Sequence, residues 1–75
     1  MNRQRKKAIA RLAEQVSAIA DELESLKDEE DEARESMPEN LWGSERYETS
    51  EACSQVMEEA LDSLEAASSS LFEIT

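Results

Sequence analysis

Two pairs of carboxylates in this 75-residue chain imitate a catalytic pattern, although such matches are expected by chance in a chain that is a quarter acidic. Glu32 and Glu35 are followed by Glu59 and Asp62, and Glu-x-x-Glu and Glu-x-x-Asp pairs on two helices can hold Mg²⁺ for nucleotide hydrolysis. A heptad frame with Ile9 at position a puts these four carboxylates at c and f, pointing away from the helix seams. Four outward carboxylates do not converge on one ion. We therefore expect no metal, no cofactor and no enzymatic activity.

Other reactive side chains are scarce. The run from Asp28 to Glu32 lacks the central glycine of a calcium-binding loop, and on a helix its carboxylates spread around the axis. The chain has no His, which removes the commonest general base. Cys53 is the only cysteine and falls at a d position, so we expect it to be buried as a small apolar residue.

The charge of the chain is divided unevenly. The formal net charge is −11, yet residues 1–11 hold five of the eight basic residues and no acid. This basic segment is too short for a zipper-type DNA-binding helix, so no direct contact with nucleic acid is expected. No apolar run approaches the length of a membrane span, and no secretory signal is present. These features predict a cytoplasmic protein that attracts basic partners.

The first half of the chain predicts one long helix over residues 3–36. Its apolar residues alternate at spacings of three and four, which is the a/d pattern of a heptad. Ala13 and Ala20 fall at e positions and widen this stripe. The stripe consists of Ile9, Leu12, Val16, Ile19, Leu23 and Leu26.

The second half is nearly a sequence repeat and predicts a helix over residues 44–73. Three seven-residue blocks open with Glu and close with Met57, Leu64 and Leu71, which take the a positions. Small residues fall at d, namely Cys53, Ala60 and Ala67, and small residues permit close helix packing. Ser44 or Thr49 can cap the start of this helix. The serine run at residues 68–70 weakens helix propensity, so we expect fraying there.

Residues 37–43 contain the only Pro and the only Gly and predict a reversal of the chain. Ser36 and Glu39 have the spacing of a capping box, which indicates a short helical turn inside the loop. Trp42 and Tyr47 flank this turn. Their simplest role is to pack over the tip, and the alternative is that they are exposed anchors for a partner.

The predicted fold is all-α: an antiparallel two-helix hairpin forming a single domain over residues 1–75. Its apolar stripes are broader than one seam can cover, so we expect a homodimer that completes a four-helix bundle. The basic start and the acidic end of the first helix both oppose the helix dipole, and a head-to-tail dimer relieves both. The expected oligomer seam comprises Ile9, Leu12, Val16, Ile19, Leu23, Leu26, Met57, Leu64 and Leu71.

The acidic surface is the strongest candidate for binding a partner. Nineteen carboxylates along a ~50 Å rod give roughly one charge per 2.6 Å, against one per ~1.7 Å for duplex DNA. Such a rod could occupy a basic groove that normally holds nucleic acid. The expected partner-binding residues are Glu22, Asp28, Glu29, Asp31, Glu32 and Glu35.

The segment Met-Pro-Glu-Asn-Leu-Trp-Gly-Ser-Glu-Arg-Tyr-Glu (37–48), followed by Glu-Ala-Leu-Asp-Ser-Leu-Glu-Ala (59–66), resembles small helical proteins of phages and mobile elements of Gram-positive bacteria. The resemblance brings no activity and no site residues. It favours an inhibitor or regulator of a host protein, such as a defence nuclease, in the bacterial cytoplasm. The alternative is a structural, oligomerising coiled coil without nucleic-acid mimicry.

Overall fold

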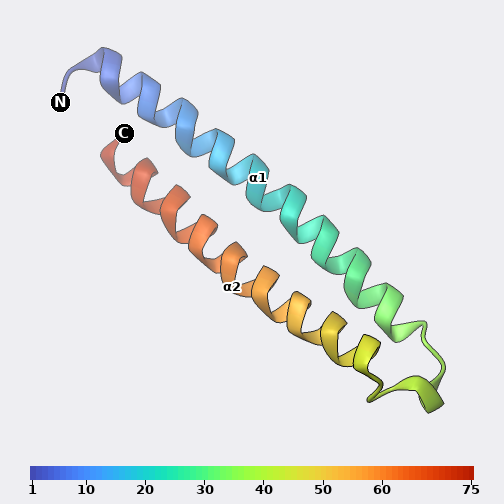
Figure 1. Ribbon diagram of the computed structural model, residues 1–75. Helices are drawn as coiled ribbons and strands as arrows, with labels where there is room; N and C mark the ends of the chain where they lie inside the picture. The colour runs from blue at the N-terminus through green and yellow to red at the C-terminus, as the bar shows by residue number, and fades with distance from the viewer.

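The computed structural model covers residues 1–75 and consists of two long antiparallel helices joined at one end. Helix α1 spans Arg3–Glu35, a short 3-10 turn η1 spans Glu39–Leu41, and helix α2 spans Glu45–Ile74. The hairpin is a rod of 60 × 14 × 12 Å with both termini at its open end, where α1 extends beyond α2 (Figure 1). The predicted all-α helical hairpin is therefore confirmed.

Side-chain caps fix the start of each helix. The Asn2 side chain accepts a hydrogen bond of 2.8 Å from the backbone N–H of Arg5. Ser44 does the same for the N–H of Tyr47 at 3.3 Å. Each cap satisfies one of the backbone donors that a helix leaves free in its first turn.

The loop reverses the chain with two special residues. Gly43 has φ +89°, a left-handed conformation that glycine adopts at little cost. Pro38 precedes η1, which confirms the predicted short turn. The predicted capping box is wrong, because the Ser36 hydroxyl donates back to the Glu32 carbonyl at 3.0 Å instead of capping η1.

The two aromatic residues of the turn pack on each other. The Trp42 and Tyr47 ring centroids lie 6.0 Å apart with an interplanar angle of 30°. The Trp42 indole N–H also donates a 2.9 Å hydrogen bond to the Met37 carbonyl. These contacts tie the loop to the first turn of α2, while Trp42 stays half exposed.

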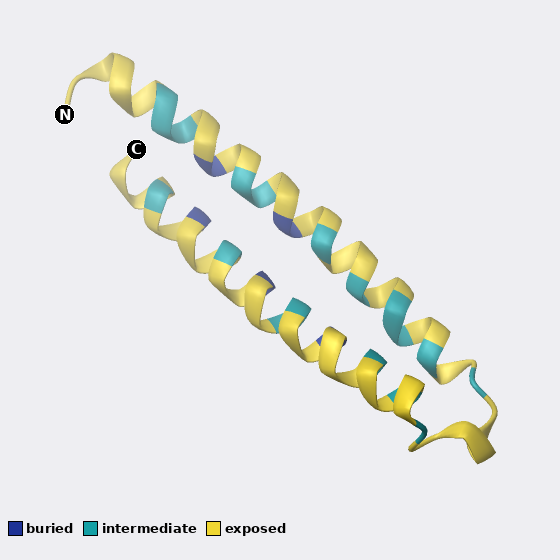
Figure 2. Ribbon diagram, viewed as in Figure 1, coloured by how far each residue is buried: buried dark blue, intermediate teal, exposed yellow.

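The helices meet through positions a and e of the heptad. The five buried residues of the chain are all at e: Ala13, Ala20, Ser54, Leu61 and Ser68. The intermediate layer is formed by the a residues Ile9, Val16, Leu23, Met57, Leu64 and Leu71. These residues line the inner side of each helix along the whole rod (Figure 2).

The expectation that the a and d stripes of both helices close on each other is wrong for the d stripe. Leu12, Ile19 and Leu26 are 52%, 53% and 57% exposed. In α1, the small e residues Ala13 and Ala20 let the two helix backbones approach more closely than Leu12 or Ile19 would. In α2, the e residues Ser54 and Ser68 face inward and form hydrogen bonds across the seam, although most d residues of that helix are also small.

A smaller expectation about α2 also fails: Cys53, expected to be buried, is exposed because it lies in the d stripe. The serine run at residues 68–70 lies inside α2, which continues to Ile74, and Ser68 is buried. The Ser68 hydroxyl donates a 3.2 Å hydrogen bond to the Ala13 carbonyl across the seam.

Candidate functional site: a polar clasp between two unlike faces

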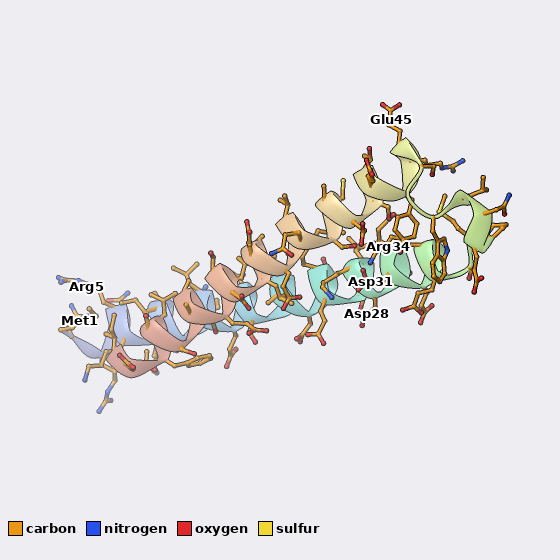
Figure 3. All side chains as sticks on the ribbon, turned by 90° about the horizontal axis from the view of Figure 1, so that it is seen from below. Met1, Arg5, Asp28, Asp31, Arg34 and Glu45 are labelled. Carbon is orange, nitrogen blue, oxygen red and sulfur yellow. The ribbon has the colours of Figure 1, made fainter.

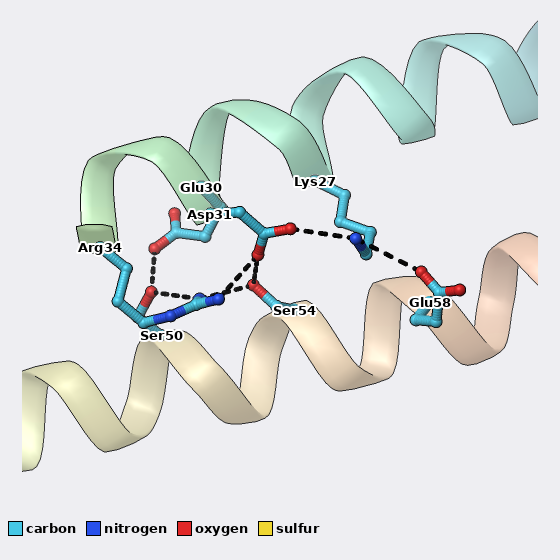
Figure 4. Close-up of polar contacts among 7 residues, drawn as sticks. All are labelled: Lys27, Glu30, Asp31, Arg34, Ser50, Ser54 and Glu58. Carbon is cyan, nitrogen blue, oxygen red and sulfur yellow. Dashed lines mark hydrogen bonds and ion pairs between the residues drawn. The ribbon is translucent and has the colours of Figure 1, made fainter. Parts of the chain in front are cut away.

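A network of seven polar side chains joins the helices near the turn, and we call it the polar clasp. Arg34 lies at its centre, with its guanidinium donating to Ser54 at 2.7 Å and to Ser50 at 3.1 Å. The Ser54 hydroxyl donates in turn to Asp31 at 2.7 Å. The members of the clasp are Lys27, Glu30, Asp31, Arg34, Ser50, Ser54 and Glu58 (Figure 4).

Ion pairs complete the clasp. Asp31 accepts from Lys27 at 3.0 Å and from Arg34 at 2.8 Å. Lys27 reaches across the seam to Glu58 at 3.4 Å. The Arg34 side chain is only 15% exposed and that of Asp31 is 27% exposed, so water screens these charges less than it screens surface pairs.

The clasp shifts the proton affinity of its charged members. Hydrogen bonds from Ser54, then Lys27 and Arg34, hold the pKa of Asp31 far below its ordinary value of 3.8. Hydrogen bonds to Asp31 and Glu58 raise the pKa of Lys27. Asp31 also raises the pKa of Arg34. Asp31, Lys27 and Arg34 thus hold their charges more firmly than the free side chains would.

The clasp separates two sides of the hairpin that differ in chemistry. Because α2 runs antiparallel to α1, the d positions of both helices project from one side and the b positions project from the other. Two solvent-open hollows lie near the turn. The d residues Ala33, Arg46 and Cys53 line the first, of about 970 Å³, together with mostly polar side chains, and Lys27, Glu51 and Glu58 line the second, which has no apolar residue.

The first side is apolar. We call it the apolar face and define it by the d residues, of which Leu12, Ile19, Leu26 and Ile74 are between 42% and 57% exposed. The other apolar d residues are Ala33, Cys53, Ala60 and Ala67, all exposed, and the charged d residues Arg5 and Arg46 stand at the first d position of each helix. The large apolar side chains therefore come from α1, while the apolar side chains of α2 are small except at the last position.

The opposite side carries most of the acid, and we call it the acidic face. Its residues occupy b and f positions, and f positions of α1 place a carboxylate every seven residues, about 10.5 Å apart. Apart from Asp31 and Glu58, none of its carboxylates forms an ion pair within the chain. The acidic face comprises Glu14, Asp21, Glu24, Asp28, Asp31, Glu35, Glu48, Glu51, Glu58, Asp62 and Glu65.

The six carboxylates expected to bind a partner lie on different sides of the hairpin. Asp28 and Glu35 are exposed on the acidic face. Asp31 is on that side too, but its carboxylate is held in the clasp. The remaining three, Glu22, Glu29 and Glu32, are exposed at g and c positions that flank the apolar face.

The ends of the rod differ in charge. Arg5 lies at the open end, and Asp28 and Asp31 lie in the half nearest the turn (Figure 3). None of the five basic residues among the first eleven forms an ion pair within the chain. The rod is therefore positive at its open end and strongly negative towards its turn.

No group of three or more acidic, cysteine or histidine side chains is placed to hold a metal ion. Glu32, Glu35, Glu59 and Asp62 are all exposed, as their heptad positions predict. Neither helix combines the length and the apolar character that crossing a bilayer requires.

Sequence reasoning overlooked the clasp, although a signal for it was present. Lys27 and Arg34 continue the seven-residue series that begins with Ala13 and Ala20, and Ser54 belongs to the matching series in α2. Ala13 and Ala20 mark the e position as part of the seam. A Lys or Arg at the next e positions is therefore expected to face the seam as well, where its charge needs a partner.

Comparison with known proteins adds no assignment: no protein-family model, no curated protein and no solved structure matches the chain.

Proposed function

We propose that this protein acts by binding other proteins and not by catalysis, and that its acidic face docks on a basic surface that otherwise holds nucleic acid. The carboxylate series of α1 is the observation that carries the proposal. Glu14, Asp21, Asp28 and Glu35 repeat along one side of a rigid helix, and all four are exposed and unpaired. A regular row of fixed negative charge is the feature that a phosphate-binding groove recognises.

The rod has the dimensions for this role. Its Cα atoms extend over 60 × 14 × 12 Å, so it is a slender rod that can lie along an elongated groove. The f carboxylates of α1 repeat every ~10.5 Å along the rod, so they offer a row of negative charges to the cationic side chains of such a groove.

The polar clasp supports the binding role by holding the acidic face rigid. Lys27 and Arg34 lie beneath the carboxylates nearest the turn and join the two helices there. A surface that is already ordered loses less conformational entropy when it binds. Asp31 thus serves the face by positioning α2, and the outward carboxylates contact the partner.

In its sharper form, the proposal makes the protein a phage-type inhibitor of a host protein, for example a defence nuclease, in the cytoplasm of a bacterium. The small size of the chain, its net charge of −11 and the resemblance of residues 37–48 support that form. Trp42 and Tyr47 are the proposed anchors at the tip, where Trp42 is 48% exposed. A second proposed partner is another copy of the same chain.

Capture experiments test the acidic face. Immobilised wild-type protein is exposed to a lysate of Gram-positive bacteria at low salt, and bound proteins are challenged with duplex DNA. We expect retention of nucleic-acid-binding proteins that duplex DNA displaces and that moderate salt releases. The variant E14Q/D21N/D28N/E35Q should retain at most about a tenth as much.

A matched variant tests whether position matters as well as charge. E22Q/E29Q/E32Q/E59Q removes the same number of carboxylates from positions outside the acidic face. It should keep most of the captured protein. Equal loss with both variants, or capture that salt and DNA do not reverse, would refute docking through the acidic face.

The alternative function, a structural coiled coil without a client groove, is favoured by the exposed apolar face. It predicts that no basic protein is retained at low salt, whereas self-association of the purified protein persists.

A further inference from the structure

We propose that the apolar face binds a second copy of this chain, with the two rods running in opposite directions, so that α1 packs on α1 and α2 on α2. This interface goes beyond the proposed client-binding function and does not depend on it. It lies on the side opposite to the acidic face. The resulting four-helix assembly displays two acidic faces, one on each outer side.

The first argument is the thinness of the hairpin core. Only Ala13, Ala20 and Leu61 are buried apolar residues, and no large side chain is fully buried. A chain of this size rarely gains enough stability from so little burial. The exposed leucines and isoleucines of the apolar face provide the missing layer once another apolar surface covers them.

The second argument concerns the sizes of the residues on the apolar face. α1 contributes Leu12, Ile19 and Leu26, whereas α2 contributes alanines at the corresponding levels. Pairing α1 with α1 creates a layer of large side chains at one edge of the interface. Pairing α2 with α2 brings alanines together, where helix axes approach to about 8 Å.

The third argument is charge, and it selects the direction. Two face-to-face arrangements keep the copies related by a two-fold axis: rods parallel, with turn beside turn, or rods opposed. Parallel rods place like charges together at both ends. Opposed rods place the basic open end of each copy beside the acidic turn half of the other.

The register follows from the length of α1. Ile19 lies at the middle of Arg3–Glu35, so full overlap puts Ile19 beside Ile19 of the second copy and Leu12 beside its Leu26. Arg5, itself a d residue, then lies level with Ala33 of the second copy. Glu29 and Glu32 flank Ala33 at g and c positions, within reach of the Arg5 guanidinium.

The overhang of α1 fits this register. The first turns of α1 extend past the end of α2 and have no neighbour within the chain (Figure 1). In the opposed arrangement they lie over the turn half of the second copy. Arg11 then approaches Glu29 of that copy, which gives the basic segment the ion pairs it lacks in one hairpin.

A charge-swap experiment tests the orientation without touching apolar residues. In an opposed homodimer of R5E/R11E the new acids face Glu29 and Glu32, and in one of E29K/E32K the new lysines face Arg5 and Arg11, so both homodimers have like charges at both ends. A heterodimer of the two variants has opposite charges at both ends. By sedimentation equilibrium at low salt, we expect each variant to self-associate roughly tenfold or more weakly than wild type. An equimolar mixture should regain wild-type affinity.

The matched control is E48K/E51K, which changes charge by the same amount near the turn but on the acidic face. It should self-associate like wild type, and mixing it with R5E/R11E should add no heterodimer of wild-type affinity, because Glu29 and Glu32 are unchanged in both chains. Restoration by the control as strong as by E29K/E32K would mean that only net charge matters, and it would overturn the proposed register.

Disulfide trapping gives a second, independent readout in a C53S background. In the opposed arrangement I19C pairs with itself, because like helices are adjacent and Ile19 lies at the centre of the register. In the parallel arrangement the two Ile19 positions lie at opposite edges of the interface and do not bridge, since a disulfide needs Cα atoms within about 7 Å. Rapid oxidation of I19C supports the proposal, and failure of I19C to bridge in a protein that dimerises overturns it.

An apolar substitution tests the face itself. I19S should weaken dimerisation by roughly 100-fold or more, because one side chain is lost from each copy at the centre of the interface. F72S is the control, since Phe72 is also half exposed but lies at a b position on the other side. Circular dichroism of both variants shows whether the hairpin persists. A wild-type chain that is monomeric at 100 μM would refute the interface outright.

Discussion

The hydroxyl of Ser68 donates a hydrogen bond of 3.2 Å to the backbone oxygen of Ala13, and both residues are buried. A side chain no larger than serine fits where these two helix turns meet. The contact explains how a run of three serines remains helical, because one of them satisfies its hydroxyl inside the seam. It also fixes which side of each helix faces inward.

Enlarging Ser68 should therefore separate the helices at the open end. S68L is expected to lower the free energy of unfolding by about 1–3 kcal/mol, since extra atoms in a close-packed seam force the backbones apart. Urea denaturation followed by circular dichroism measures the change. The neighbouring S69L, at an exposed position, is the control and should change stability by less than about 0.5 kcal/mol. Equal effects would show that Ser68 is not in the seam.

Asp31 should make stability depend on pH in acid. Its folded pKa is lowered, so its stabilising contribution is present above the ordinary pKa of 3.8 and is lost as pH falls below that value. D31N is expected to melt several degrees below wild type at pH 7. The gap should shrink below pH 4 and nearly close near pH 1.5.

The control for Asp31 is D28N, which removes an exposed carboxylate that has no ion pair in the chain. Its melting temperature should equal or exceed that of wild type at pH 7, because the net negative charge falls. A D31N gap that stays constant from pH 7 to pH 2 would argue against ionised Asp31 as the hub of the clasp.

The raised pKa of Lys27 predicts that stability falls with rising pH in the alkaline range. Its pKa is raised by Asp31 and Glu58, so its contribution is present below the ordinary pKa of 10.5 and disappears as pH rises through the raised value. K27M should therefore be less stable than wild type at pH 8, with the difference shrinking above pH 11. Thermal melts at both ends of that range test it.

Gly43 should resist substitution for a backbone reason alone. Its φ of +89° is strained for any side chain, while a Cβ there would meet nothing within 4 Å. G43A is expected to cost about 1–2 kcal/mol of unfolding free energy, and G43N less, because asparagine tolerates the left-handed region better. A G43A protein as stable as wild type in urea would mean that the turn has another conformation.

The sequence predicted the elements of the fold well because local signals specify them. The three-four spacing from Ile9 to Leu26 specifies a helix, and Pro38 with Gly43 specifies where the chain reverses. These signals act over a few residues and do not depend on the partner helix. The all-α hairpin and the short turn therefore followed from the chain alone, and of the two candidate caps, Ser44 and Thr49, the structure has Ser44.

The rotation of the helices about their axes could not be predicted in the same way. In a stripe that covers positions a, d and e, either the a and d residues or the a and e residues can face the other helix. The choice depends on which pair of positions gives the closer cross-helix contacts. Ala20 and Ser68 offer closer approach than Leu12 and Ile19 do, and Arg34 finds its partners only on the e side. These preferences involve residues 16 to 55 positions apart, so they emerge only when both helices are placed together.

The sequence predicted that acidic residues form the candidate site, but it did not predict which of them are free and which are held in ion pairs. The carboxylates at Asp28 and Glu35 are exposed as expected. Asp31 differs because its carboxylate is ion-paired with Lys27 and Arg34, whose e positions face the seam. Whether a carboxylate is free or ion-paired depends on which side of each helix faces the other. The local sequence pattern does not specify that side.

The central claim is that e residues close the hairpin while d residues remain for a second copy, and isotope-filtered nuclear Overhauser spectroscopy on a mixture of labelled and unlabelled chains tests it most directly. We expect contacts between Ala13 and Ser68 within one chain, and contacts between Leu12 and Leu26 only between chains. Contacts between Leu12 and α2 of its own chain, with Ala13 turned to solvent, would contradict the claim.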